Sequence, residues 1–274
     1  MARANYVIEQ PYPSPKSRVD LFGVTIDAVS MDEAVRQVMS WIDEPFGTCR
    51  YVVTPNADHT VMLQEHEGLR DAYLDADMVL ADGFPVILAS RLLGRRLPER
   101  VAGSDLVPAL FTAADQKRSL RTFLLGAAPG VADRAAERIE TTWAGVEIVD
   151  TYSPPFGFEH DDVEQERILT RVRDANPDIL VVGLGAPKQE VWVHKQRGEI
   201  KAPVVLCVGA TIDFLAGERS RAPRWLQRIH LEWFYRMMGE PRRLFWRYAR
   251  DAWVFPQLVW REWRSVPNTQ KSTD

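Results

Sequence analysis

One carboxylate stands where catalytic groups are often found, directly after a buried strand. Asp82 follows the apolar run 78–81 (MVLA) and precedes Gly83, a flexible residue. A carboxylate in this position can act as a general base when a substrate hydroxyl comes within hydrogen-bonding distance. Asp82 could instead cap a helix that begins near Pro85. The spacing alone leaves both interpretations open.

A glycine-bearing segment, 183–189 (GLGAPKQ), lies between an apolar run and a helical pattern. Such a loop lets a phosphate or a sugar approach the backbone, and the following helix N-terminus favours an anion. It is not the dinucleotide fingerprint, because Lys188 occupies the place of the third glycine, and the sequence has no Walker A loop. A tight turn between strand and helix is an equally good interpretation.

Other reactive groups give weaker signals. Asp75 and Asp77 form an Asp-x-Asp pair, but the pair precedes a strand, and a solvated helix end is the better interpretation. The five histidines lack the spacing of metal ligands. Cys49 and Cys207 are too few for a disulfide framework and fit a reducing compartment. We therefore expect neither a metal site nor a cofactor.

The elements that must position these groups alternate in type along the chain. We expect strands at 20–27, 50–54, 78–81, 122–125, 146–152, 178–183 and 203–209, and helices at 31–41, 57–75, 85–93, from 103, 131–143, 162–175 and 187–197. This alternation predicts an α/β fold with a mainly parallel, doubly wound, Rossmann-like sheet and helices on both faces. The loops that follow the strands would then lie along one edge of the sheet, where ligands bind.

The C-terminal part differs from the rest of the 274-residue chain. Residues 1–216 carry 22 basic and 32 acidic side chains, whereas 217–266 carry 11 arginines, no lysine, five acids and six of the nine tryptophans. We expect a flexible arm (1–18), an α/β catalytic domain (19–216), a helical appendage (217–264) broken at 239–241 and at Pro256, and a flexible tail (265–274).

The arginine-rich appendage admits several roles. It could bind nucleic acid, an anionic membrane surface or a phosphorylated substrate, or it could form a helical hairpin with its tryptophans in the core. Tryptophan mixed with arginine suits a helix in the lipid headgroup region, and arginine suits bidentate phosphate contacts. The acidic body disfavours nucleic acid. The N-terminus has no apolar signal region and the chain has no apolar run of about 18 residues, so we expect a cytoplasmic protein.

Ordered motifs give the chain a resemblance to the WecG/TagA/CpsF glycosyltransferase family. The segments occur in the family's order between about residues 21 and 248, and GLGAPKQE and RVAG-D are the most specific of them. They are 22–24 (FGV) to Asp27, 54–57 (TPNA), 81–83 (ADG), 98–105 (PERVAGSD), 125–127 (LGA), 183–190 (GLGAPKQE), 208–210 (VGA) to Asp213, 221–223 (RAP), 231–236 (LEWFYR) and 240–243 (EPRR).

The resemblance implies a reaction and a location. Members transfer a sugar from a UDP-sugar to a polyprenyl-diphosphate-linked sugar at the inner face of the bacterial membrane, with inversion and without a metal. N-acetylmannosamine and an N-acetylglucosamine-type acceptor are the expected sugars. The appendage would bring the enzyme to the anionic membrane surface as a peripheral protein, and a homo-oligomer is compatible with the sequence.

The resemblance also implies residue roles. Asp82 would take the proton from the acceptor hydroxyl, and Arg236 and Arg243, with Arg247 as a third, would neutralise the diphosphate. The other expected site residues match family motifs: Thr54, Asn56, Arg100 and Gln189 around the sugar and acceptor, Gly126, Gly185 and Asp213 toward the nucleotide, and Gly83, Lys188 and Glu190 as further substrate contacts.

Three departures from the family pattern keep alternatives open. Phe84-Pro85 stand where the teichoic branch usually has a second glycine, His230 replaces a common glycine, and Trp246 replaces an arginine of some members. UDP-N-acetylmannosamine, its uronic acid and UDP-glucose all remain possible donors. A nucleotide-dependent oxidoreductase and a nucleic-acid-binding protein are the alternatives of a different class.

Overall fold

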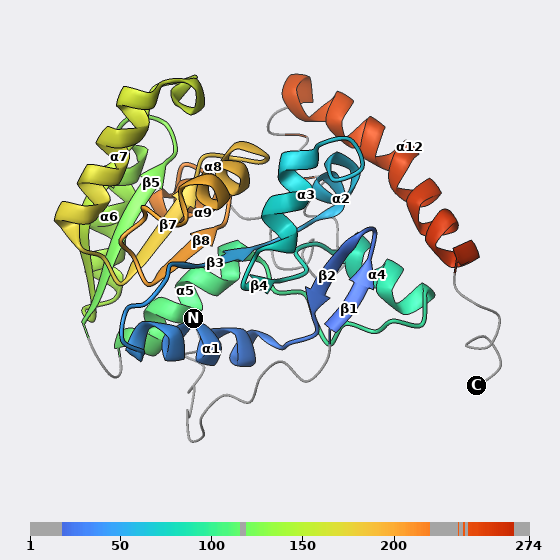
Figure 1. Ribbon diagram of the computed structural model, residues 1–274, viewed down its shortest axis with the longest axis horizontal. Helices are drawn as coiled ribbons and strands as arrows, with labels where there is room; N and C mark the ends of the chain where they lie inside the picture. The colour runs from blue at the N-terminus through green and yellow to red at the C-terminus, as the bar shows by residue number, and fades with distance from the viewer. Residues whose placement is uncertain (1–17, 116–118, 220–234, 236–237, 239–240, 266–274) are drawn as a thin grey trace.

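The computed structural model describes residues 18–115, 119–219, 235, 238 and 241–265. A six-stranded sheet, all parallel, forms its centre in the order β4-β3-β8-β7-β5-β6 (Figure 1). Its strands are β3 (Arg50–Val53), β4 (Met78–Val79), β5 (Leu120–Gly126), β6 (Val146–Tyr152), β7 (Ile179–Gly183) and β8 (Val204–Cys207). The α/β fold with a doubly wound parallel sheet, expected from the alternation of elements, is confirmed.

Helices cover both faces of the sheet because successive strand residues alternate between the faces. On β3, Tyr51 and Val53 enter one core cluster and Val52 enters the other. The Val52 face is covered by α1 (Met31–Asp43), α5 (Gly103–Asp115), α6 (Val131–Thr142) and α9 (Thr211–Ala216). The Tyr51 face is covered by α3 (Glu67–Leu74), α7 (Asp162–Ala175) and α8 (Lys188–Gln196), with α2 (Ala57–Met62), α4 (Phe84–Leu92) and a short 3₁₀ helix (Phe158–His160) nearby.

The predicted start of α1 shows how local sequence fixes an element. Ser30 caps the helix, its side chain accepting a hydrogen bond from the backbone N–H of Glu33, while the Glu33 carboxylate accepts one from the Ser30 N–H. This reciprocal capping box satisfies two N–H groups that the helix itself leaves unpaired.

The strand order gives the sheet a topological switch point between β5 and β7, the place that we call the β5–β7 crevice. The chain leaves β5 through α6 toward the edge strand β6, and it leaves β7 through α8 toward the central strand β8. These two helices lie on opposite faces of the sheet. In open α/β sheets ligands bind where neighbouring strands diverge in this way, beyond their carboxyl ends.

Two expected elements are each divided in the structure. The segment 20–27 is a hairpin of β1 (Arg18–Leu21) and β2 (Val24–Asp27), because Phe22 (φ 56°) and Gly23 (φ 84°) form a left-handed two-residue turn. The pattern at 57–75 is two helices, α2 and α3, because His66 accepts a hydrogen bond from the Leu69 N–H and caps a new helix there.

The C-terminal helix α12 (Pro241–Ser265) contacts α2 and lies along one side of the molecule (Figure 1). The expected break at Pro256 is wrong, because the helix continues through it. An interior proline destabilises a helix by about 3 kcal/mol. Here Phe255 packs against Phe22, with the two rings tilted by 53° and their centroids 5.3 Å apart, and Leu258 is buried in the core. Contacts on both sides of Pro256 thus hold one continuous helix.

The remaining expectations fall at the limits of the described residues. The arm up to residue 17, the break at 239–240 and the tail from residue 266 lie outside them, and Arg18 already belongs to β1. No described helix is both long and apolar enough to cross a membrane.

Candidate active site

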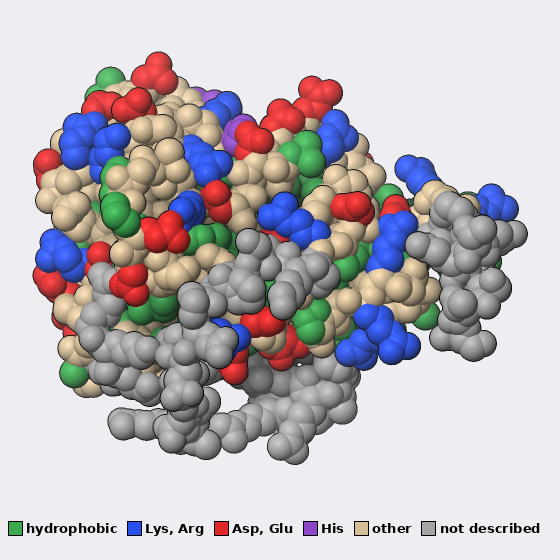
Figure 2. Space-filling view, turned by 60° about the horizontal axis from the view of Figure 1, so that its bottom comes forward, with side chains coloured by type: hydrophobic (Ala, Val, Ile, Leu, Met, Phe, Trp, Pro, Cys, Tyr) green, Lys and Arg blue, Asp and Glu red, His purple; other side chains and the backbone are tan. Residues whose placement is uncertain are grey.

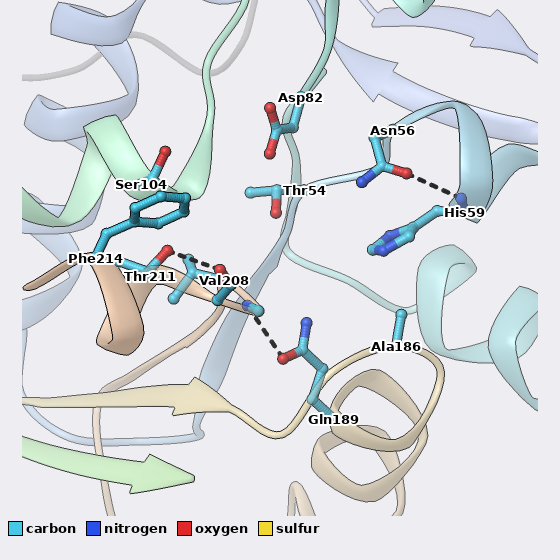
Figure 3. A pocket seen from close by; sticks show the side chains of 12 residues that line it. Thr54, Asn56, His59, Asp82, Ser104, Ala186, Gln189, Val208, Thr211 and Phe214 are labelled. Atoms are coloured by element: carbon cyan, nitrogen blue, oxygen red, sulfur yellow. Dashed lines mark hydrogen bonds between the residues drawn. The ribbon is translucent and has the colours of Figure 1, made fainter. Parts of the chain in front are cut away.

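A pocket opens at the carboxyl edge of the sheet, where the loops after β3, β4, β7 and β8 converge (Figure 3). Its volume is about 460 Å³, counted out to the solvent at its mouth. The lining residues are Thr54, Asn56, His59, Asp82, Ser104, Ala186, Gln189, Val208, Gly209, Ala210, Thr211 and Phe214. Four of the residues that sequence analysis assigned to catalysis, Thr54, Asn56, Asp82 and Gln189, therefore meet in one place.

Backbone groups hold the two residues that follow β3. The Thr54 hydroxyl, which is buried, donates a hydrogen bond to the Cys207 carbonyl oxygen at 3.2 Å and so ties the ends of β3 and β8 together. Asn56 caps α2, its Oδ1 accepting a hydrogen bond from the His59 N–H at 3.1 Å. The Asn56 Nδ2 is thereby turned toward the pocket (Figure 3) and can donate to a ligand.

Asp82 is held beside the loop after β3. Its N–H donates to the Pro55 carbonyl oxygen at 2.8 Å, and its carboxylate reaches the pocket with 29% of the side chain exposed. Gly83, not Asp82, occupies the cap position of α4. The carboxylate is thus placed to meet a substrate hydroxyl.

Arg100 lies between two carboxylates at the rim of the pocket. Its Nη1 is 3.9 Å from Asp82 Oδ1, and its Nη2 is 2.8 Å from Asp105 Oδ2. The side chain of Arg100 is 36% exposed, so water screens these contacts and leaves the guanidinium accessible. Arg100 therefore stands next to Asp82, although it does not itself line the pocket.

Gln189 is held at both ends of its amide. Gly209 N–H donates to Gln189 Oε1 at 3.2 Å, and Gln189 Nε2 donates to Glu190 Oε1 at 2.8 Å. The Nε2 group points toward the middle of the pocket (Figure 3). Because both amide atoms have fixed partners, Gln189 presents one defined N–H to a ligand.

Glu190 differs from the substrate contact that we expected. Its side chain is fully buried behind Gln189 and is not among the pocket-lining residues. Burial raises the pKa of Glu190 to about 7, while the hydrogen bond from Gln189 lowers it. Its Oε2 has no hydrogen-bond partner among the described residues. The structure thus gives Glu190 contact with Gln189, not with the pocket.

The expected glycine and lysine positions lie around the β5–β7 crevice and the starts of helices. Gly126 (φ +116°) must be glycine, since a Cβ there would come within 2.6 Å of the Gly183 carbonyl group. Gly185 lies just before α8, and Lys188 at its start pairs with Glu159 at 2.6 Å. None of these three lines the described pocket.

Asp213 and the three expected arginines occupy different places. Asp213 lies in α9, with its Oδ2 3.4 Å from Arg219 Nε, outside the pocket lining. Arg247 lies in α12, with its Nε 3.6 Å from Asp58 Oδ2 in α2. The whole of Arg236 and the side chain of Arg243 lie outside the described residues.

Sequence reasoning missed several pocket residues, and His59 is the most polar of them. His59 was set aside because it lacks metal-ligand spacing, yet it stands three residues after the cap residue Asn56. Residues three apart on a helix share a face, and that signal could have placed it beside Asn56. Ser104 and Phe214 line the opposite side of the pocket (Figure 3).

The Asp-x-Asp pair is a solvated helix end, as favoured, only at Asp75, whereas Asp77 is mostly buried and structural. Asp77 forms a bidentate contact with Arg197, with Nη2 2.9 and 2.8 Å from its two carboxylate oxygens, and accepts a hydrogen bond from the Tyr51 N–H. Its partner Asp75 is 65% exposed at the end of α3. Asp77 thus fixes the loop before β4, the strand that leads to Asp82.

The family model described as glycosyl transferase WecG/TagA/CpsF family matches residues 19–269 of this chain. The chain belongs to this family. The match includes both the sheet that carries the pocket and helix α12, so the resemblance seen in the sequence motifs is confirmed.

Two bacterial relatives of this glycosyltransferase family carry the same description, N-acetylglucosaminyldiphosphoundecaprenol N-acetyl-beta-D-mannosaminyltransferase. The protein of Bacillus spizizenii is 34% identical over 208 residues, which are 76% of this chain and 77% of the relative. That of Staphylococcus aureus strain MW2 is 26% identical over 231 residues, 84% of this chain and 88% of the relative. The chain is therefore a glycosyltransferase that is similar to these proteins over most of their length.

Proposed function

We propose that this glycosyltransferase moves N-acetylmannosamine from its UDP-sugar to a polyprenyl-diphosphate-linked N-acetylglucosamine, with inversion at the anomeric carbon and without a metal. The description of the two relatives supports the sugar and the acceptor. The observation that carries the proposal is the pocket in which Asp82, after β4, meets Thr54 and Asn56, after β3, and Gln189, in the first turn of α8. Amide and hydroxyl groups of this kind recognise sugar hydroxyls.

The reaction that we propose is a single displacement. The acceptor hydroxyl gives its proton to an Asp82 carboxylate oxygen while the hydroxyl oxygen forms a bond to the anomeric carbon. The bond from that carbon to the diphosphate oxygen breaks on the opposite side, and UDP leaves with the electron pair.

The charge that develops on the departing diphosphate must be stabilised. Arg236, Arg243 and Arg247 have this role in the proposal, since guanidinium groups form bidentate hydrogen bonds with phosphate oxygens. The described contact of Arg247 with Asp58 places α12 beside α2, whose cap residue Asn56 lines the pocket. The nucleotide would lie toward the β5–β7 crevice, near Gly126 and Gly185.

The outer face of α12 supports a peripheral position on an anionic membrane. Trp246, Trp253 and Trp260 recur every seven residues and are 77%, 74% and 55% exposed. Arg250, Arg261 and Arg264 are also exposed on this helix. Figure 2 shows basic side chains gathered on the right of the view, whereas acidic and basic side chains alternate on the left. Exposed tryptophan with arginine is typical of helices in the headgroup region.

The experiment that tests the function measures UDP release. Wild-type protein is given UDP-N-acetylmannosamine, its uronic acid or UDP-glucose, each with a short-chain polyprenyl-diphosphate-N-acetylglucosamine, with and without EDTA. We expect acceptor-dependent release with UDP-N-acetylmannosamine that EDTA does not reduce. Turnover with another donor only would overturn the sugar assignment, loss of turnover in EDTA would overturn metal independence, and the absence of turnover with every donor would contradict the reaction itself.

A further inference from the structure

We propose that His59 is a further substrate-binding residue, which donates a hydrogen bond from Nε2 to a neutral oxygen atom of the bound sugar. The inference rests on the proposed function, because the ligand is taken to be the sugar of a UDP-sugar or of its acceptor. It adds a residue, and the class of group that this residue recognises, to the pocket built around Asp82.

His59 is placed at the pocket by the start of α2. Asn56 caps this helix through the His59 N–H, and the imidazole projects from the first turn toward the middle of the pocket (Figure 3). It stands between Asn56 and the Gln189 side of the pocket, opposite Phe214 and Ser104. The side chain of His59 is only 11% exposed, so a ligand in the pocket would exclude most of the remaining water.

The orientation of the imidazole is fixed from behind. Its Nδ1 is 2.7 Å from the Tyr73 hydroxyl, and the two rings meet edge to face with centroids 6.4 Å apart. Tyr73 is buried, and burial raises its pKa, so the hydroxyl keeps its proton. This hydroxyl has no other acceptor among the described residues, and donation to Nδ1 places the imidazole proton on Nε2.

The same surroundings keep the imidazole uncharged. Burial, and to a smaller extent the positive charge of Arg247, lower the pKa of His59 to about 4. Glu190 Oε1 is 4.0 Å from Nδ1. The pKa of this carboxyl group is about 7, so below that pH it is mostly protonated and uncharged. A neutral imidazole adds no positive charge for a diphosphate. It suits a sugar hydroxyl or an acetamido oxygen instead.

Nε2 has no hydrogen-bond partner among the described residues, although it belongs to a pocket-lining side chain. The contact with Tyr73 occupies only Nδ1, so Nε2 remains available to a ligand in the pocket. His59 Nε2 is therefore an oriented, uncharged and unpaired donor at the wall of the pocket, and such a donor can select an oxygen atom of a ligand.

Two substitutions separate the two nitrogen atoms. His59→Asn keeps a polar atom near the position of Nδ1, so it can still bond to Tyr73, but it loses the group at Nε2. His59→Gln places its amide near Nε2 and loses the group at Nδ1. The matched control is His194→Gln, because His194 also lies near a tyrosine hydroxyl (Tyr51, 3.4 Å) but does not line the pocket.

The measurements are kcat and KM for the UDP-sugar and the acceptor, the inhibition constant of free UDP, and the thermal midpoint of each variant. We expect His59→Asn to lower kcat/KM about tenfold or more, as the loss of one pocket hydrogen bond does, with an unchanged inhibition constant for UDP. His59→Gln should retain more activity than His59→Asn, even where its thermal midpoint is lower. His194→Gln should behave as wild type.

Three results would overturn the inference. Activity of His59→Asn equal to wild type would show that Nε2 touches no substrate. Losses of activity that follow the thermal midpoints of the two variants would show a structural role. An inhibition constant for UDP that rises as much as KM would place the contact on the nucleotide. All three presuppose turnover by wild-type protein, so failure of the proposed function is recognised separately, by a wild-type protein that neither turns over nor binds any UDP-sugar.

Discussion

The pocket and the contact between α2 and α12 hold their polar side chains in different ways. In the pocket, Thr54 and Gln189 bond to backbone groups of the loops and strand ends around them, and both are buried. At the α2 contact, Arg247 of α12 approaches Asp58 at 3.6 Å, and farther along α12 Glu262 pairs with Arg95, which follows α4, at 2.6 Å. The first arrangement depends on the sheet, whereas the second depends on charges near solvent.

This difference teaches where rigidity resides in the molecule. Ion pairs that are partly exposed contribute only about 0–1 kcal/mol each, so the apolar contacts of Phe255 and Leu258 supply most of the energy that holds α12. Asp251 makes the packing of α12 dependent on pH, because burial and the neighbouring Asp58 raise the pKa of Asp251 to about 7. The lining residues that the structure describes all lie between Thr54 and Phe214, and α12 is an added layer whose outer face stays available.

Removal of the C-terminal region is the strongest test of this division. A chain that ends at Arg219 loses Arg236, Arg243 and Arg247, and we expect turnover to become undetectable because the diphosphate loses its cations. Binding to anionic vesicles should be lost as well. UDP release and vesicle flotation measure the two effects, and circular dichroism shows whether the sheet remains folded. Full activity in the folded, truncated protein would disprove a shared site.

Asp82→Asn tests the body side of the comparison. We expect kcat to fall about a hundredfold or more, since the amide cannot accept the acceptor proton. The KM for the UDP-sugar should change little, because the substitution preserves size and location. Asp75→Asn, at an exposed position outside the pocket, is the matched control. A kcat within a few-fold of wild type would show that Asp82 is not the base.

The outer face of α12 is tested by a double substitution, Trp253→Ala with Trp260→Ala. We expect about tenfold weaker binding to anionic vesicles or more, because each exposed tryptophan contributes on the order of 1 kcal/mol at the interface. Turnover of a soluble short-chain acceptor should stay unchanged. Phe156→Ala removes an aromatic ring that is 98% exposed on the body and should leave vesicle binding intact. Equal losses in both variants would contradict a specific role for α12.

Glu190→Gln sharpens the comparison through stability. Burial raises the native pKa of Glu190 from 4.5 to about 7. Between pH 4.5 and about pH 7, the native state therefore keeps a proton that the unfolded state loses. Wild-type stability therefore falls across this window as pH rises. Relative to wild type, the variant should be about 3 kcal/mol more stable at pH 8 and similar at pH 4.5, by urea unfolding. An equal difference at both pH values would show that Glu190 is ionised throughout.

Much of the fold was predictable because its signals are local. The capping box at Ser30 and the apolar run of β7 each specify an element without reference to distant residues. Where the prediction failed, distant packing decided the outcome, as at Pro256, where contacts with Phe22 and the core keep the helix continuous.

The candidate site was predictable to the extent that strand ends determine it. Thr54, Asn56 and Asp82 follow strands, and the sheet brings them together. Glu190 could not be assigned correctly from the sequence, because neighbouring helix positions point in different directions, whereas for His59 the only signal was its spacing of three residues from Asn56. The burial of Glu190 and the contact of His59 with Tyr73 exist only after α2, α3 and α8 pack together.

The strand order has a consequence for how the chain acquires its pocket during synthesis. Strand β8 joins the pair β4–β3 to the group β7–β5–β6 in the sheet, and it is the last of the six strands to be synthesised. Thr54 and Asp82 belong to the first group, whereas Gln189 follows the second. A nascent chain that has not yet inserted Val204–Cys207 therefore lacks the strand that joins the two half-sites. Such late, long-range pairing slows folding, and here it means that the last strand to pair also assembles the chemistry.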